Sequence, residues 1–125
     1  MPPYTVNDDV SRMIWKMWFL PEYDTLRKLQ VKLTEMGIVS RLKKPYGRFA
    51  ISRLAWRFAC DNIEEAKDDF RKGYATRNVP FDAYAEENFY RKLIAAAVHY
   101  MHGKRLDDWI AKNDLEKYRK YIIYR

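Results

Sequence analysis

Apolar residues recur at helical spacing along most of this chain, and that pattern limits it to helical folds. Val10, Met13, Ile14 and Met17 follow the i, i+3, i+4, i+7 spacing that places side chains on one helix face. No segment shows a convincing alternation of apolar and polar residues, as a half-buried strand would. We therefore predict an all-α protein of five or six helices with short connections.

Glycines and prolines divide this pattern into segments. Pro21 should end the first helix, and the second should run from Glu22 to Met36 with Gly37 as its C-terminal cap. The next pattern runs from Phe49 to Gly73. It predicts either one long helix or two helices that meet near Asp61, where Asp61 and Glu64 have the spacing of a capping box.

The last third of the chain predicts further helices. After a linker over residues 74–80, Asp82 should cap a helix that runs to about His102 and is closed by Gly103. A short helix with Leu106, Trp109 and Ile110 follows. A last amphipathic turn should then contain Leu115, Tyr118 and Ile122.

The length of 125 residues predicts a single domain over residues 1–125. Pro2 and Pro3 disfavour a helix at the start, so we expect an extended arm over residues 1–6. Tyrosines alternate with lysines and arginines near the end, which predicts a basic aromatic tail over residues 114–125. The single cysteine, Cys60, cannot form an internal disulfide and fits a reducing compartment.

The first predicted helix is apolar on more than one side. Trp15, Trp18 and Phe19 fall outside its main apolar stripe, so they predict contact with a partner or a membrane interface, beside which Arg12 and Lys16 could extend their charges. The longest apolar runs are far shorter than the roughly 20 residues that cross a bilayer. The alternative for the many aromatic residues is a core built from rings.

One window, from Met36 to Cys60, contains six basic residues and no Asp or Glu. The rest of the chain is almost balanced, with 18 basic and 17 acidic residues. Aromatic residues lie between these charges, so the window predicts a surface that binds an anionic partner: protein, lipid head groups or RNA. Its predicted binding residues are Arg41, Lys43, Lys44, Tyr46, Arg48, Arg53 and Arg57. The acidic run that follows, from Asp61 to Asp69, predicts a solvated face.

The chain contains no motif that is typical of an enzyme. His99 and His102 have a metal-like spacing, but no recognised motif supplies the third and fourth ligands that zinc needs. Cys60 lies among apolar residues, where a free cysteine usually acts as a small hydrophobic side chain. We find no phosphate loop and no dinucleotide fingerprint. We therefore predict no catalytic residues, no metal and no cofactor.

One segment resembles a known family. Val79-Pro80, Tyr84, Glu86-Glu87-Asn88-Phe89-Tyr90 and the following charged stretch with Lys104, Arg105 and Trp109 are similar to the C-terminal part of the small matrix-facing helical subunit of ubiquinol:cytochrome c reductase, respiratory complex III. The resemblance covers about residues 79–112. It implies an all-helical, non-catalytic subunit held against membrane-embedded protein.

These observations predict a non-catalytic structural accessory subunit of a multi-protein assembly. The resemblance favours a mitochondrial respiratory complex, with the chain on the matrix side of the inner membrane. Expected partners are other subunits of the complex, with anionic lipid as a further contact. The alternative is an RNA-contacting, ribosome-associated protein, whose binding would weaken steeply with salt.

Overall fold

The computed structural model describes residues 7–40 and 42–122, and it confirms an all-α single domain. The elements, in chain order, are α1 (Asn7–Trp18), the 3-10 helix η2 (Pro21–Tyr23), α2 (Leu26–Glu35), α3 (Arg48–Asp61), α4 (Ile63–Thr76), α5 (Ala83–Ala97), α6 (Gly103–Lys112) and the 3-10 helix η3 (Glu116–Tyr121). Within the described residues, extended pairing is limited to one isolated antiparallel bridge between Val39 and Pro45. The predicted arm over residues 1–6 lies outside the described part.

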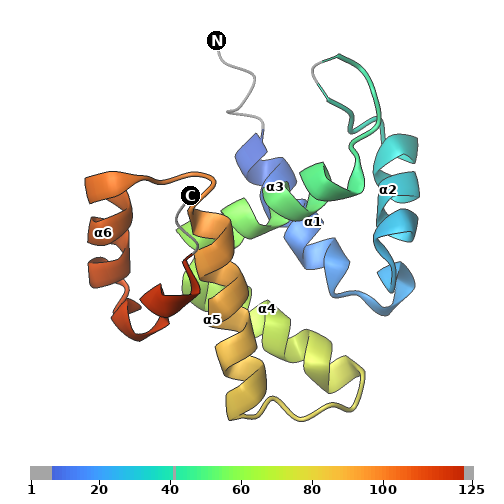
Figure 1. The fold of residues 1–125 in the computed structure, drawn as a ribbon. Helices are drawn as coiled ribbons and strands as arrows, with labels where there is room; N and C mark the ends of the chain where they lie inside the picture. Colours follow the sequence, from blue (N-terminus) through green and yellow to red (C-terminus); the bar gives the residue numbers. More distant parts are fainter. Residues whose placement is uncertain (1–6, 41, 123–125) are drawn as a thin grey trace.

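Helix α3 is the centre of the fold. It packs against α1, α2, α4 and α5, and Figure 1 shows it crossing the middle of the molecule. Six of its residues are buried: Ile51, Ala55, Trp56, Phe58, Ala59 and Cys60. The second half of the predicted basic window therefore also carries the largest share of the core.

Aromatic rings from four helices meet in this core. Trp15 of α1 lies 4.9 Å from Trp56 of α3, measured between ring centroids. Phe89 of α5 lies 5.9 Å from Trp56 and 5.2 Å from Phe70 of α4. Rings at these distances attract one another beyond the area that they bury. Part of the aromatic content thus forms the core, as the alternative interpretation had it.

Trp15 corrects the predicted apolar stripe of the first helix. Its side chain is 0% exposed, whereas Val10, Met13 and Met17 of the predicted stripe are only half-buried. The reason is the position of α3, which packs along the side of α1 that carries Ile14 and Trp15. A side chain without exposed area does not contact a membrane or a partner while the fold is intact.

Three helices end in the same hydrogen-bonded motif. After α2, Gly37 has φ +77°, its N–H donates to Thr34, and the N–H of Ile38 donates to Leu33. This is a Schellman arrangement, and it confirms the C-terminal cap that the sequence predicted at Gly37. Asn78 after α4 and Asp114 after α6 take the same left-handed conformation with the same two bonds, although neither is glycine.

The helical conformation is interrupted at Asn62, between α3 and α4. The alternative of two helices that meet near Asp61 is therefore confirmed. The predicted capping box is not formed. Asp61 is the last residue of α3, and the N-cap residue of α4 is Asn62, whose side chain makes no cap bond. Its amide nitrogen instead donates to the carbonyl of Phe58 at 3.2 Å, which ties the break back to α3.

Three predicted boundaries were wrong. The second helix begins at Leu26, because Thr25 takes an extended conformation and its hydroxyl accepts the N–H of Lys28. Helix α4 continues through Gly73 to Thr76, so the linker is shorter than expected. Helix α5 begins as predicted after Asp82, whose carboxylate accepts the N–H of Ala85 at 2.9 Å, but it ends at Ala97. Gly103 opens α6 instead.

The described part of the predicted C-terminal tail packs on the domain. Leu115, Tyr118 and Ile122 are buried, as the amphipathic turn predicted. The ring of Tyr118 stacks on Tyr90 of α5 at 4.7 Å. Residues 114–122 therefore belong to the folded body, while Tyr124 lies outside the described residues.

None of the helices described is both long enough and apolar enough to cross a membrane.

Candidate interaction surface

Two features of the surface contain four of the predicted binding residues: Trp18 and Arg53 in the first, and Lys43 and Lys44 in the second. The first is an open groove of about 440 Å³ between the end of α1, the first half of α3 and the end of α5. We call it the aromatic groove. Its lining residues are Trp18, Phe49, Ser52, Arg53, Trp56, Lys92, Ala95, Ala96, His99 and Tyr100.

The apolar lining of the aromatic groove comes mainly from rings. Phe49 is 86% exposed, although it lies in the first turn of the central helix. Trp18 is half-buried and stacks on Phe19, and Trp56, which also lines the groove, is buried in the core. A large exposed ring beside rings that are anchored in the core is typical of protein contact surfaces.

The polar lining is cationic. Arg53 and Lys92 line the groove from α3 and α5, and His99 lines it from the turn after α5. Among the described residues that line the groove there is no Asp or Glu. The groove therefore offers rings together with positive charge, which suits a partner with apolar and acidic side chains.

Tyr100 joins two walls of the groove. Its hydroxyl donates to the backbone carbonyl of Arg53, which links the turn after α5 to α3. Burial raises the pKa of Tyr100 to about 12, with the nearby Cys60 adding to the shift. The hydroxyl therefore keeps its proton, and its hydrogen bond, at neutral pH.

The second feature is the basic loop, which we define as Ser40 together with residues 42–45. Its backbone is closed by hydrogen bonds from the Ser40 N–H to the Lys44 carbonyl at 2.9 Å and from the Lys43 N–H to the Ser40 carbonyl at 2.8 Å. The Ser40 hydroxyl also accepts the N–H of Lys44. Leu42, Lys43 and Lys44 are all exposed.

The other residues predicted in the basic window have separate positions. Arg48 is exposed at the start of α3, and Arg57 is half-buried further along the same helix and does not line the groove. Tyr46 is half-buried, and its carbonyl accepts the side chain of Gln30 at 2.9 Å. Arg41 lies outside the described residues.

The cations predicted at a membrane interface are bound within the fold. Arg12 pairs with Glu65 at 2.8 Å, and Lys16 pairs with Glu65 at 2.8 Å and with Asp69 at 2.6 Å. The acidic run is therefore not simply a solvated face, because two of its carboxylates bind α1. The predicted role of Arg12 and Lys16 beside a membrane overlooked these partners, which come from more than 45 positions along the sequence.

The two aromatic residues that follow have different roles. Trp18 lines the aromatic groove, in agreement with a surface position. Phe19 packs against Phe70 at 5.7 Å and over Gly73, so it mainly joins α1 to α4.

The residues considered for chemistry are dispersed. His99 lines the groove, whereas His102 is the N-cap residue of α6. In the described part of the chain, no three His, Cys, Asp or Glu residues gather in a way that could hold a metal ion. Cys60 is buried, with its thiol 3.7 Å from the Leu93 carbonyl, and burial raises the pKa of this thiol to about 12.

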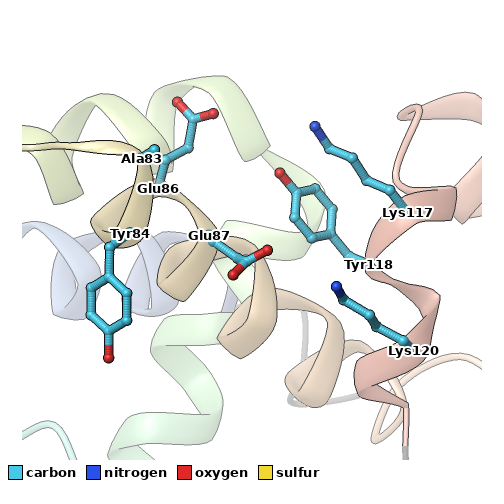
Figure 2. A pocket seen from close by; sticks show the side chains of 7 residues that line it. All are labelled: Ala83, Tyr84, Glu86, Glu87, Lys117, Tyr118 and Lys120. Atoms are coloured by element: carbon cyan, nitrogen blue, oxygen red, sulfur yellow. The ribbon is translucent and has the colours of Figure 1, made fainter.

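A smaller pocket of about 390 Å³ lies between α5 and η3. Figure 2 shows Glu86 and Glu87 on α5 across from Lys117 and Lys120 on η3, with Tyr118 between them, while the ring of Tyr84 points away from η3. Charges of both signs line it, so it has no net preference for an anion. The sequence predicted the apolar spacing of Leu115, Tyr118 and Ile122 but not that α5 is the helix they cover.

The sequence missed two features of the aromatic groove. Lys92 lies on α5 and Tyr100 follows it, far from the basic window in the sequence. The signal present was the run of alanines at 95–97, whose small side chains allow close approach. Comparison with protein-family models, with curated proteins and with solved structures found no match.

Proposed function

We propose that this chain is a non-catalytic accessory subunit of a multi-protein assembly and that it docks on another subunit through the aromatic groove. The observation that carries the proposal is Phe49, an 86% exposed ring on the central helix, beside Arg53, Trp18 and Tyr100. Aromatic residues and arginine dominate the binding energy of many protein interfaces. A partner helix that presents apolar and acidic side chains would complement this lining.

The resemblance at residues 79–112 supplies the identity of the assembly within this proposal. It favours a mitochondrial respiratory complex, with the chain on the matrix side of the inner membrane. This part of the proposal rests on the sequence resemblance alone. Docking through the aromatic groove is a separate proposal and can be tested without it.

A tagged chain expressed in its source cells tests the proposal. We expect wild type to migrate in a native gel with a complex much larger than 15.2 kDa. Covering the Phe49 ring should contribute about 2 kcal/mol, so Phe49→Ala should weaken docking by roughly 30-fold. Phe49→Ala combined with Arg53→Glu should release most of the chain from the complex.

The matched control is Tyr84→Ala, which removes a 79% exposed ring from α5 outside the groove. It should leave the complex intact. A photo-reactive amino acid at position 49 should crosslink to one defined subunit, and the same group at position 84 should not. Free migration of wild type, or equal loss in Tyr84→Ala, would contradict docking through the groove.

A further inference from the structure

The basic loop is a preformed turn. The bonds between Ser40, Lys43 and Lys44 close it, and the bridge between Val39 and Pro45 joins its two ends. Lys43 takes a left-handed conformation with φ 60°, as residues in tight turns do. Below the turn, the Ile38 N–H bonds to Leu33 and Gln30 bonds to Tyr46, so α2 holds both ends.

This turn carries an aliphatic side chain into solvent. Leu42 is 76% exposed, although leucine is among the residues most often buried. Lys43 and Lys44 follow it directly, and in the described part of the chain neither forms an ion pair. Figure 1 shows the loop standing away from the helices, on the side opposite to α6.

An aliphatic tip beside unpaired lysines matches one kind of partner best. At an anionic membrane surface, Leu42 would enter the boundary of the acyl chains while the lysines contact the lipid phosphates. RNA also offers phosphates, but its bases stack on aromatic rings, and the tip presents leucine. Tyr46, the nearest ring in sequence, is half-buried.

We propose that the basic loop binds the surface of anionic phospholipid membranes, with Leu42 inserted and Lys43 and Lys44 on the head groups. The contact is small, so the attachment is reversible and depends on salt, in the way that a single weak anchor does. It uses residues outside the aromatic groove and does not rest on the proposed function.

Sedimentation of the purified chain with vesicles tests this proposal. We expect binding to vesicles of phosphatidylcholine mixed with phosphatidylglycerol, and little binding to phosphatidylcholine alone. Lys43→Glu with Lys44→Glu should reduce the binding at least tenfold, and Leu42→Ser should reduce it several-fold. These side chains are exposed, so circular dichroism should show the same helix content in every variant.

Matched controls separate the loop from general charge. Arg105→Glu with Lys112→Glu makes the same charge change on exposed positions of α6, and Val79→Ser removes another exposed aliphatic side chain. Both should bind as wild type does. Phe49→Ala should also bind vesicles normally, so failure here and failure of groove docking are distinguishable.

Three results would overturn the proposal. They are no binding to the anionic vesicles, an equal loss in the α6 control, and an unchanged affinity in Leu42→Ser. A single-stranded RNA oligonucleotide provides the last arm of the experiment. If the loop variants lose RNA binding while wild type ignores the vesicles, the loop is an RNA contact instead.

Discussion

At the scale of single residues, the fold changes the acidity of the Cys60 thiol. Its thiol lies in the core, near the Leu93 carbonyl, and the adjacent backbone carbonyl of Cys60 accepts the indole N–H of Trp109 at 3.0 Å. Burial, with a smaller effect from Asp61, raises the pKa of the thiol from 9.0 to about 12. The sequence context of apolar neighbours predicted an inert cysteine, and the buried position agrees with it.

This pKa shift predicts a loss of stability in alkali. Above pH 9 the unfolded chain releases the thiol proton and the folded chain keeps it, so the free energy of unfolding falls as the pH rises toward 12. Between pH 9 and 10, Cys60→Ala should show a flatter dependence of the free energy of unfolding on pH than the wild type does. Urea unfolding of both proteins at several pH values checks this, and parallel slopes would contradict it.

At the scale of elements, Gly73 decides how α1 meets α4. Glycine in a helix interior normally costs about 1 kcal/mol relative to alanine. Here a Cβ at position 73 would lie 2.8 Å from Cδ1 of Phe19, a ring that is also packed against Phe70 and Trp15. Because glycine has no Cβ, position 73 leaves room for the Phe19 ring. Gly73 does not mark the end of the helix.

Gly73→Ala should therefore destabilise the protein despite its gain in helix propensity. Overpacking costs about 1–3 kcal/mol, which leaves a net loss of about 1 kcal/mol. Thermal and urea unfolding measure this loss. In the Phe19→Ala variant the clash is absent, so Gly73→Ala should stabilise the protein there. If Gly73→Ala destabilises the protein in both backgrounds, the contact with Phe19 is not the reason for glycine at position 73.

At the scale of the whole molecule, the charges divide into paired and unpaired groups. Arg12 and Lys16 of α1 pair with carboxylates of α4, which leaves the cations of the basic loop and the aromatic groove to face solvent. Desolvation lowers the pKa of Lys16, but bonds to Asp69 and Glu65 outweigh it and the net pKa is raised. The bond from Lys16 lowers the pKa of Glu65.

A double-mutant cycle of Lys16→Met and Glu65→Gln should give a coupling of about 0.5–1 kcal/mol at neutral pH. Because the pKa of Glu65 is lowered from 4.5 in the folded state, this stability is present above that pH and is lost as the pH falls through the folded value. The exposed pair Lys104–Asp108 of α6 provides the comparison and should couple less strongly. A coupling that survives acidification would contradict the assignment.

Helix periodicity, the cap at Asp82, the cap at Gly37 and the basic window could be predicted from the sequence, because each depends on local residue chemistry. The sequence left open whether the central helix is interrupted near Asp61, and the structure decided it. The contacts between the helices could not be predicted from the sequence. The pattern shows that α1 is apolar on several sides, yet it does not show which neighbour covers which side. The packing of α3 and α4 against α1 determines that Trp15 is buried in the core and that the Phe19 ring contacts Gly73. It also places Lys16 beside the carboxylates of α4. The tertiary structure also decided that Phe49 and Leu42 are exposed, because an apolar side chain stays in solvent where no other element of the described fold covers it.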